Sequence, residues 1–282
     1  MTAFPIIPGY DLLQLLGGGP MTQVFAARDR LTGGACAVKL LRPDAEDSAT
    51  GLLLLRREAR AGLNVQHPNV LSCRVAHVLR EPYFLVLPLL LPGESLRRRM
   101  ARTRRIDIPT IVAIARQIAG GLACLHRKGL LHGDLKPDNI MLLPGNGVRI
   151  IDLGSAHRPG ENQKLIEKGY ILGTPDYLAP ELCAFRQETR CSGDLFSLGV
   201  LLYEMIVGRL PYPKGNTGQT LRNHRDCLPD AIPLEAHPLP VALVDLVYRL
   251  LDNRPENRPS AAALEMQLRI LEGFGSHHWA AA

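Results

Sequence analysis

Two short stretches near the middle of the sequence carry side chains that could perform chemistry. Residues 132–139 read His-Gly-Asp-Leu-Lys-Pro-Asp-Asn, and thirteen residues after Asn139 comes Asp152, followed by Leu-Gly. Two carboxylates and an amide on adjacent loops offer hard oxygen ligands, which suit Mg²⁺ bound together with nucleotide phosphates. Asp134 would then orient an attacking hydroxyl group or accept its proton.

A glycine-rich stretch near the start of the chain could hold phosphate. Residues 16–24 read Leu-Gly-Gly-Gly-Pro-Met-Thr-Gln-Val, and glycines let backbone N–H groups approach a phosphate closely, although a plain hairpin turn looks similar. Lys39 follows Val24 by fifteen residues and ends an apolar run. It is either a solvated lysine at a strand edge or, paired with Glu58, an anchored charge for phosphate oxygens.

In order and spacing, these stretches resemble the catalytic domain of eukaryotic-type serine/threonine protein kinases, in the style of the bacterial members. The resemblance covers about residues 10–272, and the conjunction is far more specific than any one motif. Besides the glycine-rich loop, the matching motifs are Val-Lys at 38–39, Glu58, His-Pro-Asn at 67–69, His-x-Asp-Leu-Lys-Pro-x-Asn at 132–139, Asp-x-Gly at 152–154, Gly-Thr-Pro-x-Tyr-x-Ala-Pro-Glu at 173–181, Asp-x-x-Ser-Leu-Gly-Val at 194–200 and Arg-Pro-Ser at 258–260.

The resemblance implies ATP and Mg²⁺ (or Mn²⁺) as cofactors, protein substrates, and a role for each matching residue. The implied catalytic residues are Asp134 as the catalytic carboxylate, Lys136 at the transferring phosphoryl group, and the pair Lys39 and Glu58. The implied metal ligands are Asn139 and Asp152. The residues implied around the nucleotide are Leu16, Gly17, Gly18, Gly19, Val24, Ala37, Lys39, Leu87 and Leu90, with Leu87 at the back of the adenine pocket.

Other matching positions imply structural roles and an acceptor type. Glu181 and Arg258 resemble an ion pair beneath the peptide-binding loop, and Asp194 resembles the carboxylate that anchors the catalytic loop. A single partner left buried would be costly, so both members of the pair should matter for folding. Lys136 together with Thr174 resembles the serine/threonine branch.

Several residues depart from the family pattern. Pro20 and Thr22 alter the glycine-rich loop, since proline removes a donor and fixes a φ angle, which puts the affinity for ATP in doubt. Gly62 lies one turn after Glu58, where a large apolar residue is usual. Glycine weakens a helix by about 1 kcal/mol relative to alanine and is expected to leave space in the packing. We therefore expect a partly populated active position of this helix and a regulator acting in trans.

Gly133 is the most informative departure, because many relatives have an arginine there that pairs with a phosphate on the activation loop. Residues 156–169 contain no Ser, Thr or Tyr. The receptor arginine and the candidate phosphorylation sites are missing together, which predicts activity without phosphorylation of this loop. Recovery only upon phosphorylation at Tyr170 or Thr174 would contradict this.

The elements that must position these residues follow from periodicity. Residues 10–41, 70–79 and 83–88 favour strands, 52–65 a helix, and 109–128, 194–208, 240–252 and 260–272 further helices, with short strands at 139–143 and 148–151. Strands first and helices later predict an α+β fold with two lobes. We expect an N-lobe over 10–90, a C-lobe over 91–272 and a tail over 273–282.

Composition limits the alternatives. The chain has 282 residues, a net charge of +6 and 46% hydrophobic residues, which excludes a disordered chain or a coiled coil. The longest uninterrupted apolar run is nine residues, so we expect a cytoplasmic protein without a membrane segment. Six arginines at 97–105 are either a docking site for acidic groups or, preferably, a solvated helix face. The modest charge and few aromatic residues favour no nucleic-acid partner.

Two other functions are compatible with parts of the sequence. The altered glycine-rich loop and Gly62 would suit a catalytically weak kinase fold that serves as a binding or scaffolding module, whereas the complete catalytic set argues against it. His132-Gly133-Asp134 with Asn139 also resembles the loop of antibiotic kinases, which transfer phosphate to small molecules. The segment 173–181 together with Arg258 favours the protein kinase.

Overall fold

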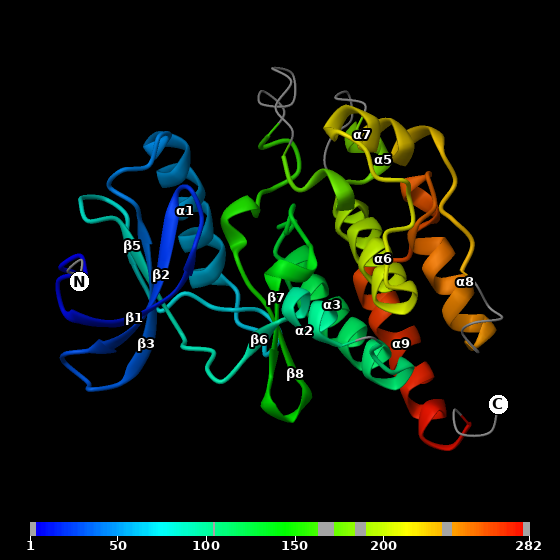
Figure 1. Ribbon diagram of the computed structural model, residues 1–282, viewed down its shortest axis with the longest axis horizontal. Helices are drawn as coiled ribbons and strands as arrows, with labels where there is room; N and C mark the ends of the chain where they lie inside the picture. Colours follow the sequence, from blue (N-terminus) through cyan, green and yellow to red (C-terminus); the bar gives the residue numbers. More distant parts are fainter. Residues whose placement is uncertain (1–3, 104, 163–171, 184–189, 233–238, 279–282) are drawn as a thin grey trace.

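The computed structural model describes residues 4–103, 105–162, 172–183, 190–232 and 239–278. A five-stranded antiparallel sheet in the order β1-β2-β3-β5-β4 forms one lobe with a single long helix, and the other lobe is mainly helical (Figure 1). The expected α+β class with strands first and helices later is confirmed. The strands of this sheet are β1 (Tyr10–Gly18), β2 (Thr22–Asp29), β3 (Ala35–Leu41), β4 (Val75–His77) and β5 (Phe84–Leu87).

Strand β3 determines where Lys39 points. Successive side chains of a strand face opposite sides of the sheet. Val38 therefore belongs to the apolar cluster on the outer face. Ala37 belongs to the cluster on the inner face, where it joins Leu55 of helix α1 (Ser48–Asn64). Lys39 lies on the same face as Ala37 and so points toward α1.

Helix α1 presents one buried stripe to the sheet. The Asp47 side chain caps its first turn by accepting a hydrogen bond from the N–H of Thr50 at 3.0 Å. Leu55, Glu58 and Gly62 are buried at helical spacing. The stripe that packs on the sheet therefore carries the carboxylate that faces Lys39.

The expectation that Gly62 leaves space in the packing is wrong. A Cβ built at Gly62 would lie 2.8 Å from Cβ of Cys73 and 2.9 Å from its backbone N. The carbonyl of Gly62 accepts a hydrogen bond from that same N–H at 2.9 Å. The chain that leads into β4 thus runs directly against α1, and glycine is needed because no side chain fits between the two backbones.

The helical lobe is built around a long apolar helix, α3 (Ile108–Arg127), which packs against α6 and α9. Its N-terminus is capped by Asp107, which accepts from the N–H of Thr110 at 2.9 Å. Within the described part of the chain, this helix alone is long and apolar enough to cross a membrane by length and composition, but 67% of that stretch is buried inside the protein. Among the described residues, the helices of this lobe are α2 (Leu96–Arg102), α3, α5 (Pro180–Cys183), α6 (Cys191–Val207), α7 (Thr217–Asp226), α8 (Val241–Leu250) and α9 (Ala261–His278).

A small antiparallel sheet lies between the two lobes (Figure 1). It consists of β6 (Glu94–Ser95), β7 (Ile140–Leu143) and β8 (Gly147–Ile150). The loop between α3 and β7 carries residues 132–139, and the loop after β8 carries Asp152. Because β7 and β8 pair directly, with Ile140 opposite Ile150, the two chemistry-bearing loops leave the same end of the sheet. Short 3₁₀ turns occur at Pro137–Asn139, Pro144–Asn146, Leu153–Ser155, Pro175–Tyr177 and Pro255–Asn257.

Candidate active site

Lys39 is held by two carboxylates from different parts of the chain. Its Nζ lies 2.6 Å from Oε2 of Glu58 on α1 and 2.8 Å from Oδ1 of Asp152. The Lys39 side chain is 11% exposed, so it is not a solvated lysine. Burial by itself lowers the pKa of Lys39, but the charges of Glu58 and Asp152 outweigh it and raise that pKa. The lysine is therefore a fixed positive charge.

Asp152 combines an unusual backbone with an accessible side chain. Its φ of 60° and ψ of 73° lie in the left-handed region, which few residues other than glycine adopt. Its side chain is 47% exposed, although its Oδ1 contacts Lys39. Burial opposes ionisation, but the charge of Lys39 and its hydrogen bond lower the pKa of Asp152. The carboxylate is thus ionised and open to a ligand.

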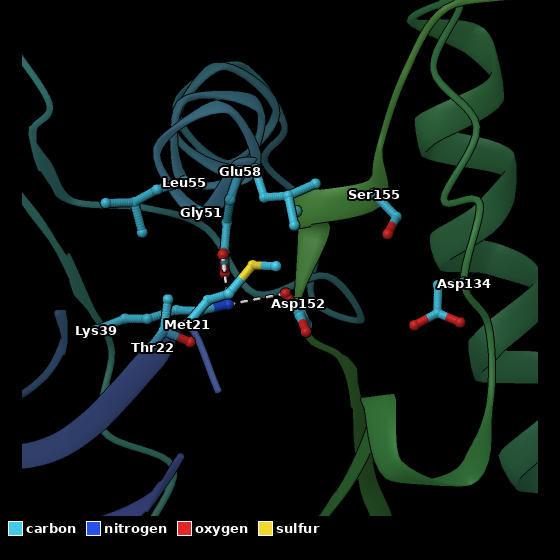
Figure 2. A pocket seen from close by; sticks show the side chains of 11 residues that line it. Met21, Thr22, Lys39, Gly51, Leu55, Glu58, Asp134, Asp152 and Ser155 are labelled. Carbon is cyan, nitrogen blue, oxygen red and sulfur yellow. Dashed lines mark hydrogen bonds and ion pairs between the residues drawn. The ribbon is translucent and has the colours of Figure 1, made fainter. Parts of the chain in front are cut away.

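Lys39, Glu58 and Asp152 line one pocket of about 200 Å³ (Figure 2). Asp134 also lines it, set apart on the side of the catalytic loop. Met21 at the tip of the glycine-rich hairpin and Thr22 at the start of β2 line it as well, and α1 supplies Leu55. The remaining lining residues are Gly51, Leu54, Gly154 and Ser155.

Asp134 is surrounded by donors. Oγ1 of Thr174 donates to Asp134 Oδ1 at 2.6 Å, and Nζ of Lys136 lies 2.7 Å from Oδ2. Lys136 Nζ also donates to the Thr174 hydroxyl at 2.8 Å, so the three side chains form a closed ring. This arrangement can hold an alcohol against a carboxylate with a positive charge beside both.

Asn139 and Asp152 are brought together by the backbone. The N–H of Ile151, the residue before Asp152, donates to the carbonyl of Asn139 at 2.9 Å. The Nδ2 of Asn139 donates to the carbonyl of Asp134 at 2.7 Å, which leaves its amide oxygen facing the other way. One amide oxygen and one half-exposed carboxylate are a donor set that fits Mg²⁺, which needs few protein ligands when phosphates and water supply the rest.

Asp194 anchors the catalytic loop from below, as the sequence predicts. It is 3% exposed, and its carboxylate accepts hydrogen bonds from the N–H groups of His132 and Gly133 at 2.8 and 3.0 Å. Nε2 of His126 lies 2.8 Å from the same carboxylate. Burial opposes ionisation, but these hydrogen bonds and the nearby histidines lower the pKa of Asp194. The loop that carries Asp134 is thus fixed by a buried negative charge.

Gly133 has no room for an arginine. Its φ is +78°, a conformation that strains any other residue. A Cβ there would lie 2.9 Å from the carbonyl oxygen of Ser155 and 3.0 Å from Cε1 of His157. His157, which the sequence left without a role, is 3% exposed and is paired through its backbone with Leu131. The loop after Asp152 therefore packs directly against the catalytic loop.

The glycine-rich hairpin closes over this site. The N–H of Gly19 donates to the carbonyl of Thr22 at 2.8 Å, so Pro20 and Met21 form the tip of the turn. A Cβ at Gly18 would lie 2.8 Å from that carbonyl, which is why glycine is required there. Gly17 pairs with Val24 across the hairpin.

The apolar residues expected around the nucleotide are only partly gathered in one cluster. Ala37 lies opposite Leu87 in the sheet, and both pack in the inner-face cluster with Val24 against it. Leu16 is 38% exposed, and neither it nor Leu90 belongs to this cluster. The position of all the predicted residues at a nucleotide stays a prediction.

Glu181 and Arg258 form the expected ion pair. The guanidinium donates to both carboxylate oxygens, at 2.7 and 2.8 Å, and the side chains are 4% and 0% exposed. The Arg258 guanidinium also stacks 5.0 Å from the ring centroid of Phe196. The segment 173–181, which carries Thr174, is fixed to the C-lobe core by this pair.

The expectation of a solvated face for the arginine run is only partly right. Arg97 donates to Glu204 at 2.8 Å and to the Tyr177 hydroxyl at 2.7 Å, and both partners belong to the buried core around α6. Arg99 and Arg102 share Glu94 at 2.6 and 2.8 Å. Arg98 and Arg105 are exposed, without an ion pair among the described residues, and Arg104 lies outside them. The sequence missed Arg97 because both partners are distant along the chain.

Comparison with known proteins agrees with this geometry. A family model described as "Protein kinase domain" matches residues 10–268. Serine/threonine-protein kinase PkaA of Streptomyces coelicolor is 32% identical over 288 residues, which cover 97% of this chain and 52% of PkaA. PkaB of the same organism is 32% identical over 270 residues, 93% of this chain and 63% of PkaB. Pkn3 of Myxococcus xanthus is 28% identical over 274 residues, 93% of this chain and 50% of Pkn3. The chain spans about half the length of PkaA and Pkn3.

Proposed function

The chain belongs to the protein kinase family, and we propose that it transfers the γ-phosphoryl group of ATP to serine and threonine hydroxyls of proteins. The observation that carries the proposal is the ring of Asp134, Lys136 and Thr174, in one structure with the Lys39–Glu58 ion pair. A hydroxyl group already sits 2.6 Å from Asp134 Oδ1. The acceptor hydroxyl of a substrate needs the same contact to be oriented for attack.

The residues divide the chemistry between them. Lys39 supplies a positive charge for the nonreacting phosphates, held in place by Glu58. Asn139 and Asp152 would hold Mg²⁺, which neutralises the charge on the phosphate oxygens when bound. Asp134 orients the acceptor and takes its proton, and Lys136 stabilises the charge that develops on the transferring group. Each role matches the donor or acceptor chemistry of the side chain and its placement in the pocket or beside it.

We further propose that this activity does not require phosphorylation of the activation loop. Gly133 and the packing of His157 leave no place for an arginine that would bind a loop phosphate. Residues 156–169 offer no hydroxyl to modify, although 163–169 lie outside the described residues, as does Tyr170. The hydrogen-bonded ring of Asp134, Lys136 and Thr174 and the intact Lys39–Glu58 pair both support an enzyme whose active site is assembled without modification.

Partners and location are also proposals. We expect protein substrates and a regulator that acts in trans, no nucleic-acid partner and a cytoplasmic setting. The buried Glu181–Arg258 pair beneath the segment 173–181 supports a surface for polypeptide acceptors. It also favours a protein kinase over a phosphotransferase of small molecules.

One experiment tests the proposal. The purified chain is incubated with Mg²⁺, γ-labelled ATP and casein, beside the variants Asp152→Ala and Lys39→Met. We expect label on serine and threonine of casein, lost in both variants and upon chelation of the metal. Label no higher than in the variants would contradict the proposal and favour a scaffolding role. Label on an aminoglycoside but on no protein would favour a small-molecule kinase.

A further inference from the structure

A tight turn follows the Asp152 loop and presents one carboxylate. The N–H of Glu161 donates to the carbonyl of Arg158 at 3.1 Å, and the N–H of Arg158 donates back to Oε2 of Glu161 at 2.9 Å. Just before the turn, Leu131 and His157 exchange backbone hydrogen bonds at 2.9 and 3.2 Å. The Glu161 carboxylate is therefore oriented by its own turn, and the turn is fixed to the catalytic loop.

Two arginines of α1 reach this turn. Nη2 of Arg60 lies 2.9 Å from both carboxylate oxygens of Glu161. Nη2 of Arg57 donates to Oδ1 of Asn162 at 2.7 Å, and its Nε lies 3.9 Å from Oε1 of Glu161. Positions three apart lie on one face of a helix, so both arginines face the turn together.

The Arg57 guanidinium depends on Glu161. The residue is 8% exposed, and its Nε finds no hydrogen-bond acceptor in the part of the chain that the structure describes. A buried charge without a counter-charge is strongly unfavourable. Loss of the Glu161 charge would therefore disfavour the position of α1 in which Arg57 is buried.

Glu58 lies between these arginines in sequence and pairs with Lys39. Helix α1 is thus held at two places, by Glu58 against the sheet and by Arg57 and Arg60 against the turn. Burial opposes ionisation of Glu161, but its hydrogen bonds with Arg158 and Arg60 lower its pKa, so its carboxylate is ionised at neutral pH. A phosphate would supply a negative charge for arginines in the same way, but only after modification.

We propose that Glu161 is a permanent substitute for an activation-loop phosphate, a positioning residue that holds α1 so that Glu58 stays paired with Lys39. The proposal rests on the proposed kinase function and explains how the chain would be active without modification. Glu161 does not touch the reacting atoms. It acts through Arg57 and Arg60 on the helix, and through the helix on the charge of Lys39.

The test compares Glu161→Gln with Glu46→Gln, a change at an exposed carboxylate without an ion pair among the described residues. Hydrogen exchange of the α1 amides and steady-state kinetics are measured on both full chains. We expect Glu161→Gln to speed α1 exchange and to lower kcat/KM at least tenfold, with α6 exchange unchanged. Glu161→Asp should restore part of both. Exchange and kinetics equal to those of Glu46→Gln would overturn the proposal.

A second variant keeps the test decisive if Glu161→Gln folds poorly. Arg60 is 43% exposed, so Arg60→Gln removes the partner at little risk to folding. The double variant should lose no more activity than Glu161→Gln alone, because Arg60→Gln removes only a contact that Glu161→Gln has already removed. Additive losses would overturn the proposal. If the wild-type chain transfers no phosphate, the proposed function fails, while α1 exchange still decides whether Glu161 holds the helix.

Discussion

Two buried ion pairs of nearly equal length serve different purposes in the two lobes. Lys39 and Glu58 are 2.6 Å apart, and Arg258 and Glu181 are 2.7 Å apart. Lys39 has a second carboxylate, Asp152, whose side chain is 47% exposed at a pocket of about 200 Å³. Around Arg258 every direction is closed by protein, so the Lys39 pair can exchange contacts with a ligand and the Arg258 pair cannot.

The surroundings of Arg258 make this closure concrete. Besides Glu181, its guanidinium donates to the carbonyls of Asp252 and Ser192 at 2.9 and 3.0 Å. The Phe196 ring covers it. The difference teaches that burial and charge alone do not identify a functional residue. An opening beside the charge does, because only there can the charge interact with something other than the fold.

The largest expected effect is at Asp152, the exposed partner of Lys39. Asp152→Asn removes the charge that would hold the metal, and kcat/KM should fall by a factor of about 10³ or more. Its free energy of unfolding should stay within about 1 kcal/mol of wild type, because the side chain is half exposed and asparagine tolerates left-handed backbone. Kinetics and urea unfolding measure the two. A large loss of unfolding free energy in Asp152→Asn would contradict the difference between the two ion pairs.

The next largest effect is expected at the fully buried pair of Arg258 and Glu181. Arg258→Met leaves Glu181 buried without a partner, which should cost about 3–5 kcal/mol of unfolding free energy. The double variant Arg258→Met/Glu181→Leu should recover much of that loss, because no unpaired charge remains. Urea unfolding checks both. If Arg258→Met were no less stable than Lys39→Met, the two pairs would not differ as described.

A smaller effect separates two helical glycines. Gly62→Ala places a Cβ against the Cys73 backbone and should destabilise the protein by about 1 kcal/mol, since overpacking outweighs the gain in helix propensity. Gly273 of α9 has open space around it, so Gly273→Ala is the matched control and should stabilise slightly. Thermal unfolding compares them. If both changes stabilised the protein, α1 would be able to move away from Cys73 at little cost in free energy.

The smallest expected effect concerns protonation of His224 in the helical lobe. His224 is 2% exposed beside Tyr212, and burial lowers its pKa. The folded state favours the neutral ring. Burial of His224 therefore contributes fully to the free energy of unfolding above the ordinary histidine pKa of about 6.5, and this contribution is lost as the pH falls below that value. Unfolding free energies at pH 7.5 and 5.5 should differ less in His224→Asn than in wild type. An unchanged difference would contradict this.

Much of the site could be predicted from the sequence because its motifs, in their order and spacing, resemble those of a known family. The pairing of Lys39 with Glu58 and the anchoring by Asp194 follow from such motifs and are confirmed. Helix α7 was not predicted, because it is polar and buries only Thr220, Leu221 and His224. A helix with so few apolar positions gives no periodic signal.

Other features could not be predicted, since they depend on contacts between distant parts of the chain. The backbone that fills the space at Gly62 belongs to Cys73, which no local pattern connects to α1. Helix α2 has seven residues, too few for a periodic signal, and its Arg97 reaches Glu204 more than a hundred residues away. Contacts across such separations require the fold to be known first.

The left-handed backbone of Asp152 has a consequence for how such a protein evolves. The conformation costs an L-residue about 1–2 kcal/mol, which glycine would not incur. Replacement of Asp152 by glycine would therefore relieve strain while abolishing the ionised ligand of the proposed metal site. At this position selection for activity and selection for stability oppose each other. In a lineage that no longer needs catalysis, glycine would be favoured at this position, which would give an inactive but more stable protein.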